Sequence, residues 1–176
     1  MKTAALLLVA AIIAGGCQAA PSAPPFTEYR DERTGFTIRV PGGWMETSLP
    51  PGGPEVRFVP RGEGAQSAEF ISVFTVPTEG TPAESEIRRQ VFGLLPIHGV
   101  SGFQQDPRTT AAVLWYRFEL TGSSGSTEWA LVGLAATGRA RMQIAVCAKP
   151  LESWRQGQKQ CDEVVRSFVP GDLAAR

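Results

Sequence analysis

Residues 111–147 read AAVLWYRFELTGSSGSTEWALVGLAATGRARMQIAVC, and this stretch decides the fold. Its first segment, Ala111–Leu120, alternates in polarity and places apolar side chains on one face at Leu114, Tyr116, Phe118 and Leu120. Thr127–Ala136 and Arg141–Cys147 follow as two further strands. Only short, glycine-containing segments separate the three. Because short turns join neighbouring antiparallel strands, the stretch predicts a three-stranded meander.

Upstream of the meander, three shorter segments also have the composition of strands. They are Phe36–Val40, Glu55–Val59 and Glu69–Val76. The third has apolar residues at both odd and even positions, with Phe70 and Phe74 on one side and Ile71 and Val73 on the other. Such a strand is buried on both faces, which predicts a sheet covered from both sides.

Two helices are predicted around the meander. Thr81, Pro82 and Glu84 form a capping box with proline at the first helical position, and Pro96 and Gly99 end that helix. Apolar residues then recur at helical spacing from Leu151 to Phe168. The resulting order of strands, helix, meander and helix predicts an α+β domain with a central antiparallel sheet flanked by helices.

The N-terminus has the pattern of a bacterial signal peptide. Lys2 precedes an uninterrupted apolar run of 11 residues, Ala4–Ala14, which is too short to span a bilayer. Small residues then lead to Cys17, an arrangement that resembles the lipobox of bacterial lipoproteins. This resemblance implies cleavage before Cys17 and a diacylglycerol on its sulfur. Ala14 stands where the lipobox usually has leucine, and an ordinary secretion site is the alternative.

The expected organisation of the chain follows from these signals. Residues 1–16 are the signal peptide, and residues 17–26 are the lipidated cysteine and a tether rich in proline and alanine. Residues 27–170 form a single domain, and residues 171–176 form a flexible tail. No stretch after the leader is long and apolar enough to span a bilayer.

The charges exclude one class of partner. The chain has 17 basic and 17 acidic residues, without a basic block or a basic stripe with interleaved aromatic residues. Nucleic acid binding is therefore not expected.

Two further cysteines, Cys147 and Cys161, are expected to form a disulfide, because exported proteins fold in oxidising compartments. Two buried free thiols are the alternative. A zinc site has less support, since His98 is the only histidine and no further ligand is near in sequence.

No catalytic, cofactor or metal site is expected. Gly122–Ser126 has the residue types of a serine hydrolase elbow, but their spacing is wrong and the segment sits in a hairpin turn. His98 is interpreted as a cap or surface residue at a helix exit. The pair Asp31 and Glu32 is interpreted as a solvated turn, because a calcium loop needs more oxygen ligands.

Two stretches resemble a known family. Tyr29–Trp44 reads YRDERTGFTIRVPGGW, and Cys161–Phe168 reads CDEVVRSF. They resemble the opening and the terminal helix of the PsbP-like superfamily, which includes DcrB-like and LpqN-like bacterial lipoproteins. The resemblance implies an α/β/α sandwich that acts as an accessory or binding module.

The expected function is that of an envelope lipoprotein, anchored to a membrane on its extracytoplasmic side. Its domain would act as a non-enzymatic accessory module that binds a protein partner. The first alternative is a small-ligand or lipid-binding protein with an apolar pocket lined by Trp115, Tyr116 and Trp154. A hydrolase that uses His98 and a photosystem-associated PsbP homologue are weaker alternatives.

Overall fold

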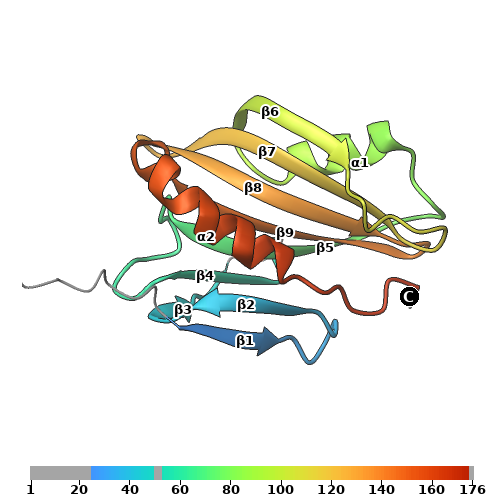
Figure 1. Cartoon of the computed structure of the whole chain (residues 1–176), viewed down its shortest axis with the longest axis horizontal. Coiled ribbons are helices and arrows are strands. Elements are labelled where there is room, and N and C mark those ends of the chain that lie inside the picture. The colour runs from blue at the N-terminus through green and yellow to red at the C-terminus, as the bar shows by residue number, and fades with distance from the viewer. Residues whose placement is uncertain (1–24, 50–52, 175–176) are drawn as a thin grey trace, which may run out of the picture.

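The computed structural model describes residues 25–49 and 53–174. The predicted signal peptide, Cys17 and most of the tether lie outside the described residues. A seven-stranded antiparallel sheet forms the centre of the domain, with strand order β3-β4-β5-β9-β8-β7-β6 (Figure 1). Its strands, in chain order, are β3 (Trp44–Glu46), β4 (Val56–Pro60), β5 (Phe70–Pro77), β6 (Ile97–Gln105), β7 (Leu114–Ser124), β8 (Thr127–Thr137) and β9 (Arg141–Pro150).

The predicted meander is confirmed. Strand β7 pairs with β8 from Leu114↔Thr137 to Ser124↔Thr127, which leaves a turn of Gly125 and Ser126 between them. Strand β8 in turn pairs with β9 from Trp129↔Pro150 to Thr137↔Met142. Strand β7 begins at Leu114 and not at the predicted Ala111. Both β7 and β9 extend beyond their predicted C-terminal ends, since their backbones continue the ladder through less apolar residues.

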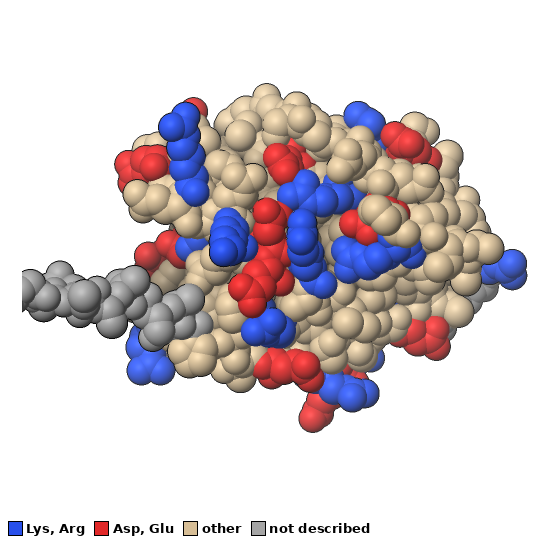
Figure 2. Space-filling model, viewed as in Figure 1, with Lys and Arg blue, Asp and Glu red and all other residues tan. Residues whose placement is uncertain are grey.

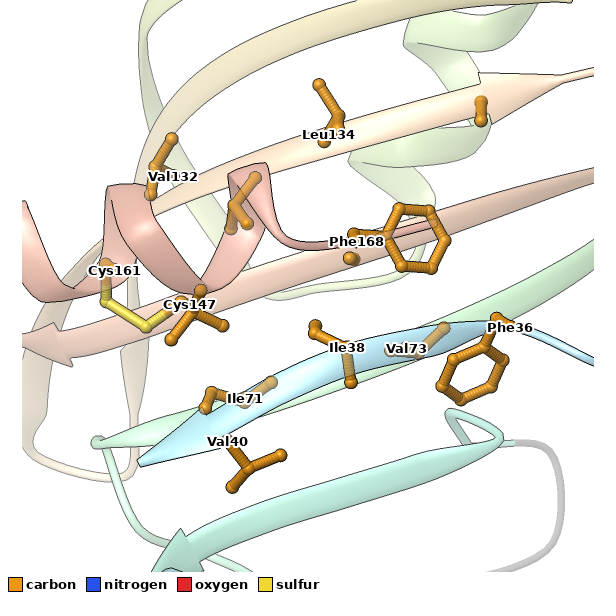
Figure 3. Close-up of a cluster of buried hydrophobic side chains, with 14 of the residues drawn as sticks. Phe36, Ile38, Val40, Ile71, Val73, Val132, Leu134, Cys147, Cys161 and Phe168 are labelled. Atoms are coloured by element: carbon orange, nitrogen blue, oxygen red, sulfur yellow. A yellow bond between two sulfur atoms is a disulfide. The ribbon is translucent and has the colours of Figure 1, made fainter. Parts of the chain in front are cut away.

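Separate hydrophobic cores occupy the two faces of the sheet. On one face, helix α2 (Trp154–Arg166) and the hairpin of β1 (Phe26–Arg30) and β2 (Thr37–Pro41) cover the α2-side core (Figures 1 and 3). On the other face, α1 (Glu84–Gly93) buries Ile87 and Val91 in the α1-side core. The structure therefore confirms an α+β sandwich.

The central strands supply both cores by strict alternation. On β5, Phe70 and Phe74 face the α1-side core, whereas Ile71 and Val73 face the α2-side core. All four are buried. The prediction that this strand is covered on both sides is confirmed.

Three strands were not predicted from the sequence, and the predicted start of one helix was wrong. Strand β6 contains Gly99 and Gly102 and pairs with β7 through two register shifts, so it lacks the regular alternation that marks a strand. Strands β1 and β3 are short. Helix α1 begins at Glu84 with Ala83 as its N-cap and without a side-chain cap, and not at the capping box predicted from Thr81.

The predicted ends of the domain also need correction. Phe26, placed in the tether from sequence, is the first residue of β1. At the other end, Leu173 is buried in the α2-side core, and its carbonyl accepts a hydrogen bond from the Ala140 N–H at 3.2 Å. The segment to residue 174 is therefore part of the domain, because one apolar side chain docks it.

The α2 segment matches its prediction closely. A single 3₁₀ turn, η1 (Leu151–Ser153), precedes the helix, and the helix ends at Arg166. Within residues 25–49 and 53–174, no helix has the length and apolar character needed to cross a bilayer.

A glycine in the middle of β8 provides a test of this packing. A Cβ added at Gly133 would lie 2.2 Å from the Phe118 ring, which is buried on the paired strand β7. We expect Gly133→Ala to lower the free energy of unfolding by about 1–3 kcal/mol through overpacking, measured by urea denaturation. Gly64→Ala is the control, because no atom lies within 4 Å of its added Cβ. Equal stability of the two variants would contradict this packing.

Candidate functional site

The predicted lipid anchor, Cys17, lies outside the described residues, and its lipidation stays a prediction. The structure does place the start of the domain. The ring of Phe26, at the beginning of β1, lies 4.6 Å from the guanidinium carbon of Arg39 on β2. Arg39 in turn forms an ion pair with Glu163 of α2 at 3.2 Å. The chain thus enters the domain beside α2.

A disulfide joins Cys147 at the end of β9 to Cys161 on α2, with a Cα–Cα distance of 5.1 Å. Both cysteines are buried in the α2-side core (Figure 3). Val164 and Val165 lie on the same side of the helix, and Phe168 follows just after its end. The disulfide and this apolar stripe hold α2 in one position on the sheet.

The opposite side of α2 carries a basic stripe of Arg155, Lys159 and Arg166. Their spacings of four and seven residues place the three side chains within about 40° around the helix axis. All three are exposed, and none forms an ion pair with any residue that the structure describes. We define the α2 face as this stripe together with the charged residues next to it, which are Arg39, Arg117, Asp162 and Glu163. On this face, acidic side chains lie between basic ones (Figure 2).

The acidic residues of the α2 face are already neutralised. Arg117 of β7 bridges Asp162 and Glu119, each at 2.7 Å. Burial alone lowers the pKa of Arg117, but its hydrogen bonds to Glu119 and Asp162 outweigh burial and raise it. Asp162, Glu119 and Glu163 are thus paired with arginines, while the three basic groups of the stripe are left over.

A second ion pair lies at the edge of the same face. Arg108 contacts Asp106 at 2.9 Å, and its guanidinium lies 4.4 Å from the Trp115 ring centre. Burial alone raises the pKa of Asp106, but the hydrogen bonds from Arg108 outweigh it, so the pKa lies below its usual value. Two surface grooves of about 550 and 440 Å³ border α2, and both are lined by Asp162 and Arg166.

His98 is exposed at the surface, as one of the two predicted roles requires, but it lies on a strand and not at a helix exit. His98 lies on edge strand β6, and its Nε2 is 2.7 Å from the Ser123 hydroxyl of β7. Among the described residues His98 has no carboxylate partner, and the Ser123 N–H already donates to the Pro96 carbonyl at 3.3 Å. The pair therefore lacks both the orienting acid and the free amide donor that serine hydrolases use.

The predicted apolar ligand pocket is filled by protein. Trp115 and Tyr116 are core residues on opposite faces of the sheet, and Trp154 packs against the α2-side core. None of the three is among the described residues that line the two grooves beside α2. Alternation along β7 separates the first two, because successive side chains of a strand point to opposite faces.

The turn that contains Asp31 and Glu32 has a structural role. Asp31 Oδ1 accepts hydrogen bonds from the N–H and hydroxyl groups of Thr34, at 2.6 and 2.7 Å. Within the described ranges, no three histidine, cysteine, aspartate or glutamate side chains come close enough to hold a metal ion.

The solution structure of cyanobacterial PsbP (CyanoP) from Synechocystis sp. PCC 6803 is similar to this chain. The TM-score is 0.61 with 16% identity, over 89% of this chain and 98% of that one. The chain has a PsbP-like fold. The crystal structure of LpqN, involved in cell envelope biogenesis of Mycobacterium tuberculosis, matches with a TM-score of 0.49 and 12% identity, over 84% of this chain and 91% of that one. No family model and no curated protein matches the sequence.

The disulfide gives the α2 face its rigidity, and its contribution can be measured. It links residues 14 apart in sequence, so the chain-entropy model gives about 3 kcal/mol. We expect a Cys147→Ala/Cys161→Ala double variant to lose about that much free energy of unfolding in guanidinium titration. Cys17→Ser, which keeps the disulfide, is the control and should unfold like the unsubstituted chain. A double variant as stable as this control would show that core packing alone positions α2.

Proposed function

We propose that this chain is an envelope lipoprotein, held at a membrane by a diacylglycerol on Cys17. Its PsbP-like domain acts as a non-enzymatic accessory module. In this role the α2 face docks on an acidic surface of a protein partner. The observation that carries the proposal is the stripe of Arg155, Lys159 and Arg166, exposed and without ion pairs among the described residues.

The pairing of the neighbouring acidic groups supports a protein partner with a defined charge pattern. Arg39 and Arg117 hold Glu163 and Asp162, so these carboxylates do not neutralise the stripe. Exposed charges contribute mainly to the rate and specificity of association. On this face, paired acidic residues alternate with unpaired basic residues. Such a pattern selects a partner whose acidic groups match the stripe.

Rigidity also supports this role. Helix α2 is cross-linked to the central strand β9, and its apolar side is buried. Binding residues on a rigid element lose little conformational freedom when a partner docks. The anchor adds proximity, because the predicted tether enters the domain beside Arg39 and the α2 face.

The test is cross-linking in living cells with the protein tagged at its native locus, followed by mass spectrometry. We expect one dominant envelope partner. The triple variant Arg155→Glu/Lys159→Glu/Arg166→Glu should reduce its recovery about tenfold or more, because the docking charges are reversed. Cys17→Ser should also lose it if the anchor brings the two proteins together.

A matched control reverses the same number of charges elsewhere. Arg30, Arg61 and Arg139 are exposed, form no ion pair with described residues, and lie in the β1–β2 hairpin, the β4–β5 loop and the β8–β9 turn. Their reversal should leave recovery unchanged. Docking through α2 would be contradicted if both triple variants lost the partner equally. It would also be contradicted if both recovered the partner equally well.

A further inference from the structure

A small pocket on the opposite face of the sheet contains an arginine without a counter-charge. The pocket measures about 200 Å³ and lies where the α1-side core ends. Arg57 of β4 borders it, together with Phe70, Trp129, Leu95 and the hydroxyl-bearing Ser123 and Ser124. We call this cavity the Arg57 pocket. Among the described residues that line it, Arg57 is the one cation, most of the others are apolar, and none is an aspartate or glutamate.

The Arg57 guanidinium uses few of its hydrogen-bond donors. One Nη donates to the Ser67 carbonyl at 2.9 Å, and the group lies 3.9 Å from the centre of the Phe70 ring. Its Nε is buried and has no acceptor. Burial lowers the pKa of Arg57 to about 10, so the group stays protonated at neutral pH. The Arg57 side chain as a whole is half-buried, and a partly desolvated cation is costly unless an anion accompanies it.

A second unsatisfied group lies directly beside it. Ser72 on β5 is opposite Arg57 in the strand register, so both side chains project from the same face of the sheet. Ser72 is completely buried, and its hydroxyl has no hydrogen-bond partner. Arg57 Nε and the Ser72 hydroxyl thus both lack a partner among the described residues, and of the two side chains only Arg57 lines the pocket.

The rim of the pocket adds further polar groups. Ser123 is held by His98 at 2.7 Å, and the Ser124 hydroxyl donates to the Gln66 carbonyl at 3.0 Å. The walls behind them are the rings of Phe70 and Trp129, whose centres are 6.0 Å apart. The pocket thus combines a polar side with an apolar one, and it is smaller than the sites that enclose drug-sized ligands.

We propose that the Arg57 pocket binds a carboxylate that carries a small apolar substituent. The carboxylate pairs with the guanidinium, whose planar donors match its two oxygens. The substituent packs against Phe70, Trp129 and Leu95. The carboxylate belongs either to a free short-chain acid or to the C-terminus of a polypeptide. This site is independent of the α2 face, which lies on the other side of the sheet.

The test is an NMR titration of the ¹⁵N-labelled, unlipidated Cys17→Ser chain. The probes are hexanoate, and hexanol and hexylamine as analogues without the carboxylate. We expect saturable shifts of the Trp129 indole N–H signal with hexanoate only. Two acetylated tripeptides ending in leucine, one with a free carboxylate and one amidated, serve as the second pair. Binding of the free tripeptide alone assigns the carboxylate to a chain terminus, and binding of hexanoate alone assigns it to a small acid.

Two variants connect binding to the guanidinium. Arg57→Met keeps the side-chain stem and should lower the affinity for the carboxylate probe about 10- to 100-fold. Arg57→Lys should retain part of the affinity. Arg61→Met, an exposed arginine outside the pocket, should bind as the unsubstituted chain does. The proposal is overturned if neither acid gives saturable shifts, if the acids and their analogues without the carboxylate bind alike, or if a folded Arg57→Met chain binds with full affinity.

Discussion

Burial of the central strands on both faces is the constraint on which the rest of this structure depends. Strands β5, β8 and β9 present apolar side chains to both sides, so neither side of the sheet can be left to solvent. One side is covered by α2 and the β1–β2 hairpin, and the other by α1. The positions of both covers follow from where the strands are most apolar.

The α2 face is a consequence of this arrangement. Because the inner side of α2 completes a core, its outer side is free to carry charge, and the disulfide to β9 keeps it in place. The ion pairs of Arg117 and Arg39 tie this outer side to β7 and β2. A rigid, charged surface beside the start of the domain is a suitable basis for docking.

The Arg57 pocket lies where the α1-side core, which helix α1 covers, comes to its end. Helix α1 buries Ile87 and Val91, and at the far end of the same core the apolar walls of Phe70 and Trp129 enclose a guanidinium. Retaining an uncompensated cation destabilises a core unless the charge has a use. The two proposed sites lie on opposite faces of one sheet, and a protein partner on α2 therefore leaves the pocket open to its own ligand.

Short-range patterns in the sequence were sufficient for the meander, the two-sided burial of β5 and the terminal helix. These features depend on periods of two and 3.6 residues and on glycine turns, which neighbouring residues alone determine. The spacing of Arg155, Lys159 and Arg166 could also have been recognised from sequence. Strand β6 was missed because its glycines and register shifts remove the periodic signal.

Only the tertiary structure decided the rest. It placed His98 beside Ser123, and it buried Leu173 in the α2-side core. Alternation in Val56–Pro60 assigns Arg57 to the side of the strand opposite Val56 and Phe58, which in a half-buried strand is the solvent side. Arg57 is half-buried there because Phe70 of the neighbouring strand and Trp129, distant in the chain, belong to a second core on that side. Burial of this kind is a property of packed elements, and no local pattern encodes it.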